Sequence, residues 1–398
     1  MRPFPPSGGQ TQRVRNLLKA LRATCEVSFL GVVRPDEREA VEEELSRHVD
    51  DVRLLDARLD RRAKRAVLGP AQAAYLFATG LKDTNFQIGA VELSPSRVLD
   101  LVGNTRYDVA VFQYWHAWRA ANAMRETGVP TILDMHNILW QSVVANRHLH
   151  RSHAQRLLIP SPRISAYRER EEIAWGSFSG ILAINHGEAD HVRGRYPSLP
   201  MMVAGMGVEL ERWPYRWSRT TGPPTIAFYG GLGIQRGVQD ALVVHDQIMP
   251  VVWEVAPDAR LVVIGADPPA EILRLANDRV EITGFVADPS RYLAEASVLV
   301  CPFAGRYGFR SRIIEALATG TPVVCTSDAI YGMGLGDRDG VAIADTVESM
   351  AARVLELVHD VDASLRASKA GRAAVEDRFD MASTYDSAAR WIAGMARH

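Results

Sequence analysis

The chain has few cysteines, almost no net charge and no long apolar run. Only three cysteines occur in 398 residues, and 46 Lys and Arg residues nearly balance 47 Asp and Glu residues. An odd number of cysteines, with Cys301 and Cys325 in predicted strands, is typical of reduced, buried thiols and argues against a disulfide framework. Balanced charge supplies no field that would attract nucleic acid, so we expect no nucleic-acid partner.

Signals for export or membrane insertion are also missing. No apolar run approaches the roughly 20 residues that cross a bilayer, and the start MRPFPPSGG lacks the apolar core of a signal peptide. We therefore expect a cytoplasmic protein. An alternative is a protein peripheral to the inner face of the membrane, because a basic cluster at residues 58–65 precedes an apolar stretch at 73–78. Residues 58–78 would then form a basic amphipathic helix instead of a solvated helix face.

Apolar strands and amphipathic helices alternate twice along the chain. The first series of predicted strands comprises residues 26–33, 107–114, 129–135, 180–184 and 201–204. The second comprises residues 225–229, 260–264, 280–283, 298–301 and 323–326. A polar, Pro-rich stretch separates them. The pattern predicts two doubly wound α/β domains, at residues 1–213 and 225–379, with a linker at 214–224 and a last helix at 380–398.

Residues 299–326 form the most informative segment, which predicts a strand, a loop, a helix and a second strand. Gly305 and Gly308 favour a tight turn into a helix that should begin near Phe309, and Gly320 in a left-handed cap should end it. Free backbone N–H groups at residues 309–311 would suit a phosphate. The helix carries one polar face, expected to point away from the core, made of Ser311, Arg312, Glu315 and Thr319.

Glu315 lies about two turns into this helix, where its carboxylate could accept hydroxyl hydrogen bonds from a sugar such as ribose. The arrangement resembles the donor-nucleotide helix of glycosyltransferase family 4, the retaining sugar transferases with the GT-B fold. In that family a Glu-x7-Glu pair occurs here, and Glu315 matches the second Glu. Tyr307 stands in place of the first, and residues 308–312 resemble the Gly-x-Arg-x-Lys run of some branches. The alternative is an ordinary capped helix of an α/β sheet.

The resemblance implies an α/β fold of two doubly wound Rossmann-like lobes facing across a cleft, and it extends to other segments. The Gly8-Gly9 turn before a helix resembles the first donor-side loop. His136 follows a predicted strand, and it resembles the family's His that hydrogen-bonds the donor sugar; Asn137 comes next. The hydrophobic strand that relatives have before the first loop is not evident, since only Met1-Arg2-Pro3-Phe4 precedes it.

The glycines of residues 230–237 follow a predicted strand and suggest a dinucleotide-binding loop. Their spacing, Gly-x-Gly-x3-Gly, and the lack of a well-placed acidic residue fit that interpretation poorly. The family instead has a basic pair here that clamps the donor pyrophosphate. Arg236 matches its second member, and Gly231 stands where the first would be. Phe285 and Val286 resemble the segment whose backbone meets the nucleotide base.

A metal site is not expected. His148, His150 and His153 are spaced two and three apart, which does not align them on one helical face, and no acidic or thiol ligand lies among them. No cofactor is expected beyond the donor substrate itself.

The sequence therefore predicts a retaining, metal-independent transferase that moves a sugar from a nucleotide-diphosphate sugar to a sugar, lipid-linked or small-molecule acceptor, in polysaccharide or natural-product glycoside synthesis. The expected catalytic residues are His136, Arg236 and Glu315. The expected donor-binding residues are Gly8, Gly9, Asn137, Gly231, Phe285, Val286, Gly308, Phe309, Arg310 and Ser311. A nucleotide-sugar epimerase, a catalytically weak donor-binding partner subunit and, last, a Rossmann oxidoreductase stay open as alternatives.

Overall fold

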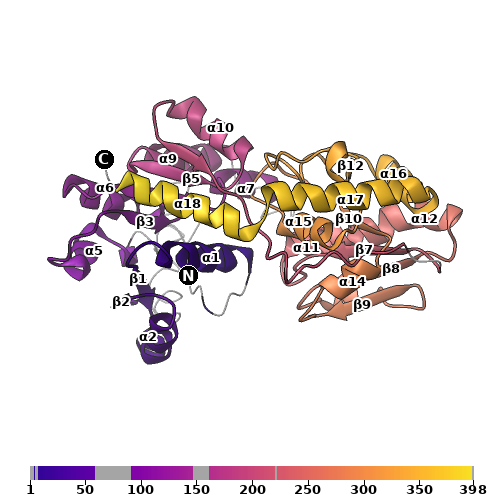
Figure 1. The fold of residues 1–398 in the computed structure, drawn as a ribbon, viewed down its shortest axis with the longest axis horizontal. Helices are drawn as coiled ribbons and strands as arrows, with labels where there is room; N and C mark the ends of the chain where they lie inside the picture. The colour runs from indigo at the N-terminus through magenta and orange to yellow at the C-terminus, as the bar shows by residue number, and fades with distance from the viewer. Residues whose placement is uncertain (1–3, 5–7, 59–90, 147–160, 220–221, 397–398) are drawn as a thin grey trace. The chain divides into compact units, whose positions relative to one another are not determined.

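The computed structural model describes residues 4, 8–58, 91–146, 161–219 and 222–396 (Figure 1). The chain forms two compact units. The first comprises residues 1–144, 152–204 and 382–398, and the second comprises residues 145–151 and 205–381. The long segment of the second unit begins at Gly205, before the linker that the sequence suggested, and residues 382–398 group with the first unit.

The second unit contains one parallel sheet of six strands in the order β12-β11-β10-β7-β8-β9. Its strands are β7 (Thr225–Tyr229), β8 (Arg260–Ile264), β9 (Val280–Gly284), β10 (Val298–Cys301), β11 (Val323–Cys325) and β12 (Val341–Ile343). Numbered from β7, this is the 3-2-1-4-5-6 order of a Rossmann-like sheet. Such a sheet binds ligands where the strand order reverses, which here is between β7 and β10 at their carboxyl ends.

Helices cover both faces of this sheet. They are α11 (Gln235–Val243), α12 (Met249–Val255), α13 (Ala270–Leu273), α14 (Ser290–Glu295), α15 (Ser311–Thr319), α16 (Val347–His359) and α17 (Val361–Arg378). Alternate strand residues, such as Ile226 and Phe228 of β7, share one core with α11, α12 and α16. A π-turn, Val244–Ile248, joins α11 to α12. The other face carries α14 and α15, which contact β7 and β11 respectively.

Helix α15 corrects two sequence expectations. It begins at Ser311, not near Phe309, because Arg310 is its N-cap. Its polar face is not turned away from the core, since Glu315 and Thr319 are buried. The segment before β7 covers that face, with the N–H groups of residues 216 and 217 donating to the Thr319 carbonyl at 3.1 and 2.9 Å. The expected end is confirmed, because Gly320 adopts φ 92°, in the left-handed region.

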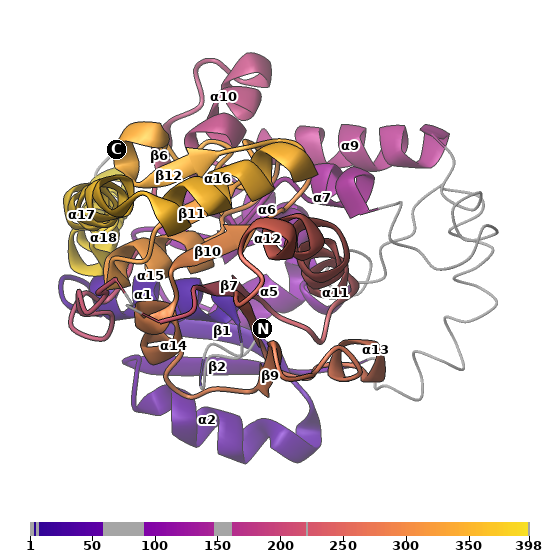
Figure 2. The ribbon, with the colours of Figure 1, turned by 90° about the vertical axis from the view of Figure 1, so that its right-hand side faces the viewer.

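The first unit holds two parallel sheets among its described residues. One pairs β1 (Ser28–Val33) with β2 (Asp51–Asp56), and α2 (Arg38–Ser46) packs on it through Leu45 (Figure 2). The other has the order β3-β4-β5-β6. Its strands are β3 (Ala110–Gln113), β4 (Thr131–Met135), β5 (Gly180–Ala183) and β6 (Met201–Val203). The residues that follow β3 and β4 lie at the carboxyl edge of this sheet.

The remaining helices of the first unit are α1 (Gly9–Arg22), α5 (Pro95–Val102), α6 (Trp118–Glu126), α7 (Leu139–Asn146), α9 (Ser161–Trp175), α10 (His186–Arg195) and α18 (Met381–Met395). Two buried carboxylates hold the start of α7. Glu171 accepts from the N–H groups of Leu139 and Trp140 at 2.8 and 2.9 Å, and Glu188 accepts from Ile138 at 2.8 Å. They satisfy the free N–H groups of a helix start and fix the loop that carries His136.

In the parts of the chain that the structure describes, every helix is too short or too polar to span a bilayer. The basic stretch at residues 58–78 lies outside the described residues except for Arg58. The cluster His148, His150 and His153 lies outside them as well.

Candidate functional site

Two loops of the second unit meet at the switch point of its sheet. The loop after β7 carries Gly230 and Gly231 and leads into α11, where Arg236 is the second residue. The loop after β10 leads into α15 and turns through Gly305 (φ 119°) and Gly308 (φ 67°). A Cβ at Gly237 would lie 1.9 Å from the Gly231 carbonyl oxygen, so only glycine lets α11 approach the loop this closely.

Three arginines gather between these loops, and two of them lie over the ring of Phe303. The guanidinium carbon of Arg310 lies 3.4 Å from the ring centroid, and that of Arg236 lies 5.0 Å from it. Arg312 reaches back to β7, since a Cβ at Gly230 would meet its Nη1 atom at 2.5 Å. Two acids lie beside the three arginines: Asp240, 3.7 Å from Arg236, and Glu315, whose carboxylate is stabilised by the charge of Arg312. The cluster therefore carries more positive than negative charge.

The cluster leaves donors unused. Within the described residues, Nε of Arg310 and Nη1 of Arg312 are shielded from solvent and have no hydrogen-bond partner. Burial lowers the pKa of Arg310 to about 10, so the guanidinium is still charged at neutral pH. Burial raises the pKa of Asp240 to about 6 although the arginines oppose this. Because a shielded N–H group without a partner is costly, the geometry suits an anion with several oxygen atoms.

Glu315 lies on α15 behind this cluster. Tyr229, at the end of β7, and Ser311, one turn earlier on α15, donate side-chain hydrogen bonds to its carboxylate. Burial raises the pKa of Glu315, and these hydrogen bonds together with the charge of Arg312 act in the opposite direction. A carboxylate has about four acceptor positions, so these two bonds leave room for hydroxyl groups of a ligand.

Arg236 is held by protein groups as well as by charge. Its Nε donates to Asn146 Oδ1 at 3.1 Å and its Nη2 to the Ala145 carbonyl at 3.1 Å. The Tyr307 hydroxyl also lies on Asn146, accepting from its Nδ2 at 2.9 Å. Ala145 and Asn146 group with the second unit. Tyr307, at the position of the family's first Glu, thus helps to hold the residue that orients Arg236.

The remaining expected residues of the second unit lie at the same sheet edge. Phe285 and Val286 directly follow β9, and the Phe285 side chain is 78% exposed. Gly308, Phe309, Arg310 and Ser311 form the turn into α15. Arg310 donates from Nη2 to the Tyr307 carbonyl at 2.7 Å, which orients its guanidinium group within the loop.

The first unit has a separate polar cluster at the ends of β3 and β4. Arg13 of α1 and Asp134 of β4 form a buried ion pair, with Arg13 Nε 2.8 Å from Asp134 Oδ1. Arg13 Nη1 also donates to the Ala204 carbonyl at 2.6 Å. His136 is buried beside them and stacks on Tyr114, whose ring centroid is 4.5 Å away. Burial lowers the pKa of His136 to about 4, so its ring is neutral near pH 7.

Gly8 and Gly9 lie at the N-terminus of α1, the helix that carries Arg13. Asn137 follows His136, and its Oδ1 atom, like Oε1 of Gln141, is shielded from solvent without a hydrogen-bond partner among the described residues. The residues that follow β4 therefore carry unpaired acceptors, whereas the loops of the second unit carry unpaired guanidinium donors.

Several residues of these clusters were missed by sequence reasoning. They are Arg13, Gln113, Tyr114, Asp134, Tyr229, Asp240 and Phe303. Three of them, Gln113, Tyr114 and Tyr229, stand at or just after the carboxyl end of a strand, a position that could have singled them out. Arg13 gave no signal, because an arginine on an amphipathic helix is usually solvated.

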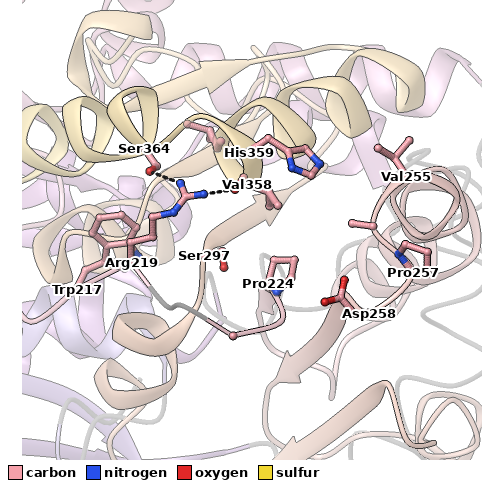
Figure 3. Close-up of a pocket in the computed structure, with 13 residues that line it drawn as sticks. Trp217, Arg219, Pro224, Val255, Pro257, Asp258, Ser297, Val358, His359 and Ser364 are labelled. Carbon is pink, nitrogen blue, oxygen red and sulfur yellow. Dashed lines mark hydrogen bonds between the residues drawn. The ribbon is translucent and has the colours of Figure 1, made fainter.

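A cavity of about 270 Å³ lies elsewhere in the second unit (Figure 3). Pro224, Asp258 and Ser297 line it just before β7, β8 and β10, so it opens at the amino ends of the strands. Arg219 at its wall donates to Ser364 Oγ at 3.1 Å and to the Val358 carbonyl at 2.5 Å. Its one arginine is thus already used, and none of the expected site residues lines the cavity.

Metal ligands do not gather in the described parts of either unit, where no three His, Cys, Asp or Glu side chains lie close enough to share an ion.

The fold and the two clusters define a two-lobed α/β protein of the GT-B glycosyltransferase class. Sucrose-phosphate synthase from Thermosynechococcus elongatus has a similar structure, with a TM-score of 0.64 and 16% identity over 98% of this chain and 94% of that one. Anabaena HepE in complex with UDP-glucose is also similar, with a TM-score of 0.64 and 13% identity over 98% of this chain and 97% of that one. At these identities the likeness concerns the fold.

Comparison with sequence families identifies the family within this class. Residues 8–207 match the family model "Glycosyl transferase 4-like domain", and residues 223–360 match "Glycosyl transferases group 1". The first match spans half of the chain, which therefore belongs to the glycosyl transferase 4-like family. A phosphatidyl-myo-inositol mannosyltransferase of Propionibacterium freudenreichii is 27% identical over 191 residues, which are 46% of this chain and 48% of that protein. The chain thus matches about half the length of this curated relative.

Proposed function

We propose that this protein is a retaining, metal-independent glycosyltransferase that moves a sugar from a nucleotide-diphosphate sugar to an acceptor. The observation that carries the proposal is the unpaired guanidinium N–H groups of Arg310 and Arg312 at the switch point of a Rossmann-like sheet. They suit the diphosphate of the donor, and Glu315 two turns into α15 suits the ribose. The similar structure of HepE was solved with UDP and with UDP-glucose, so a uridine nucleotide is the first donor to test.

The proposed chemistry is mainly electrostatic. Cleavage of the glycosidic bond leaves positive charge on the sugar ring and negative charge on the departing diphosphate. Arg236, Arg310 and Arg312 stabilise the diphosphate, and they do so without a metal ion because they are already oriented by Asn146, Phe303 and neighbouring carbonyls. The leaving phosphate accepts the acceptor's proton on the face it departs from, which retains the anomeric configuration. His136 of the first unit hydrogen-bonds the donor sugar.

We propose three classes of acceptor. The matched segment of the mannosyltransferase of Propionibacterium freudenreichii supports a lipid-linked acceptor as one candidate, and sugar or small-molecule acceptors are the others. Surface polysaccharide or a glycosylated natural product would then be the end product.

Replacing Glu315 by Ala tests the ribose contact. Two hydrogen bonds to a charged group contribute about 1.5–3 kcal/mol each, so we expect the UDP dissociation constant to rise at least about tenfold. Isothermal titration with UDP measures this. The matched control is Glu281→Ala, which removes an exposed carboxylate of β9 and leaves binding unchanged. A folded Glu315→Ala protein with unchanged UDP affinity would contradict the assignment.

Turnover tests the class of reaction. A panel of UDP-, GDP- and ADP-sugars is incubated with and without hexose, glycolipid and phenolic acceptors, and products are followed by NMR. Transfer with a retained anomeric configuration and full activity in EDTA supports the proposal. An epimerised donor formed without acceptor supports the epimerase instead. Nucleotide binding without turnover on any acceptor indicates a donor-binding subunit.

A further inference from the structure

Gln113 and His136 are joined across neighbouring strands of the first unit. Gln113 ends β3 and lies in register with Asp134 of β4, and His136 is two residues beyond Asp134. Successive side chains of a strand alternate, so Gln113, Asp134 and His136 share one side of the sheet. The His136 Nε2 atom lies 2.6 Å from Gln113 Oε1.

The groups around His136 Nε2 are both acceptors. The amide oxygen of Gln113 only accepts, and the second neighbour is Oδ2 of Asp134 at 3.7 Å. The other carboxylate oxygen, Oδ1, is engaged by Arg13. A proton on Nε2 satisfies this arrangement, and a proton on Nδ1 alone would leave two acceptors facing a lone pair.

Burial keeps the ring of His136 neutral by lowering its pKa. Asp134 favours the imidazolium form, and Arg13 acts with burial against it. Tyr114 stacks on the ring, and His116 stacks in turn on Tyr114. Since a neutral ring carries one proton, a proton on Nε2 leaves Nδ1 as an acceptor.

The Nδ1 atom of His136 receives no hydrogen bond from the described residues. Among the residues that the structure describes, this buried atom has no hydrogen-bond partner. The neighbouring Tyr114 adopts φ 64° and ψ 156°, a conformation that is rare for any residue other than glycine and that concentrates at functional sites. An oriented, neutral acceptor beside a strained residue indicates a place for a ligand group that donates a hydrogen bond.

We propose that Gln113 is a positioning residue that holds His136 in the Nε2–H tautomer, so that Nδ1 accepts a hydrogen bond from a hydroxyl of the donor sugar. The identity of the ligand rests on the proposed function, whereas the tautomer does not. Binding of a sugar with a carboxylate at this position is disfavoured, because the carboxylate and His136 Nδ1 are both hydrogen-bond acceptors.

The tautomer is measured directly on the ligand-free protein. In long-range proton–nitrogen NMR spectra of 15N-histidine-labelled protein, the His136 signals, assigned by their loss in His136→Asn, should show a bare Nδ1 and a protonated Nε2 at neutral pH. A protonated Nδ1 in the same spectra overturns the proposal.

Two variants separate positioning from packing. Gln113→Glu places a carboxylate at His136 Nε2, which raises the pKa of His136 so that the ring protonates near neutral pH. Turnover then requires the His136 ring to lose that proton. Activity should recover as pH is raised. Gln113→Leu removes the acceptor, and the KM for the donor sugar should rise about tenfold with little change in kcat. Gln247→Glu, an exposed site in the second unit, is the matched charge control.

The kinetic and NMR experiments test different parts of the proposal. If no nucleotide sugar in the panel is turned over, the proposed function fails while the NMR result still decides the tautomer. A turnover profile of Gln113→Glu that matches the wild type at every pH, or a Gln113→Leu protein with an unchanged KM, overturns the positioning role. Recovery of Gln113→Glu activity at high pH excludes a folding defect as the cause.

Discussion

The two units bury arginine in opposite ways. In the first unit, Arg13 is fully buried and its guanidinium is paired with Asp134 and with the Ala204 carbonyl. In the second unit, Arg310 and Arg312 keep N–H groups that have no partner among the described residues. The first arrangement satisfies the cation internally and is structural. The second leaves guanidinium donors that suit a bound anion, as the proposed function requires.

A second contrast concerns the unpaired atoms at the two polar clusters. The first unit leaves His136 Nδ1, Asn137 Oδ1 and Gln141 Oε1 unpaired, and these suit hydroxyl groups. The second leaves guanidinium donors, which suit phosphate oxygens. The contrast is therefore between acceptors at the end of β4 and guanidinium donors at the switch point of the second sheet.

The largest expected effect is the loss of stability when Arg13, the paired arginine, is replaced. Arg13→Met leaves the buried Asp134 carboxylate without its partner, and breaking such a pair costs about 3–5 kcal/mol of unfolding free energy. Hydrogen exchange of β4 peptides across a urea series measures the loss in the first unit itself. Adding Asp134→Leu to Arg13→Met should recover much of the stability, because no unpaired charge is then left buried.

Arg15→Met is the control for Arg13→Met on the same helix. The Arg15 guanidinium makes a hydrogen bond of 3.4 Å with Asn16 Oδ1 and is half-buried, so the change should stay within about 0.5 kcal/mol. Equal losses for the two variants would show that α1 packing, not the ion pair, sets the stability.

Arg312 should respond differently. Arg312→Met removes a half-buried guanidinium whose Nη1 has no hydrogen-bond partner among the described residues, so the melting temperature should fall far less than in Arg13→Met. UDP binding should weaken about tenfold or more, since a hydrogen bond to a charged group contributes about 1.5–3 kcal/mol. Arg306→Met is the matched control, since Arg306 lies in the loop before α15 and its side chain is 70% exposed. A large fall in melting temperature with unchanged UDP affinity would place Arg312 with Arg13, as a structural residue.

Sequence patterns anticipated the sheet framework better than the polar clusters. Strand β7 is found at its expected residues, and β8 likewise, because short apolar runs bounded by turn residues have few alternatives. The left-handed cap at Gly320 and the turns at Gly305 and Gly308 were also anticipated, since only glycine adopts these conformations readily. These features are local, and local rules suffice for them.

Burial of the polar residues was not anticipated, because it depends on segments far away in the chain. Glu315 was expected on an outward face, yet Tyr229 hydrogen-bonds it and residues before β7 cover its helix. The pair of Arg13 with Asp134 joins residues 121 positions apart. No periodicity within either segment reveals such a partner. Arg236 and Arg310 do lie after the carboxyl ends of β7 and β10, as the sequence indicated, because this edge of the sheet follows from strand order.

The smallest expected effect concerns the position of Arg312, not its charge. A Cβ at Gly230 would lie 2.5 Å from Arg312 Nη1, so Gly230→Ala must displace that flexible guanidinium while keeping it charged. We expect UDP affinity to fall by about three- to fivefold, less than the tenfold step that corresponds to 1.4 kcal/mol. Titration calorimetry resolves a change of this size. The adjacent Gly231→Ala is the control, because its Cβ would meet nothing within 4 Å. If Gly231→Ala weakens binding more than Gly230→Ala does, the diphosphate lies against the backbone of the β7 loop, and the unpaired Nη1 of Arg312 is not what recognises it.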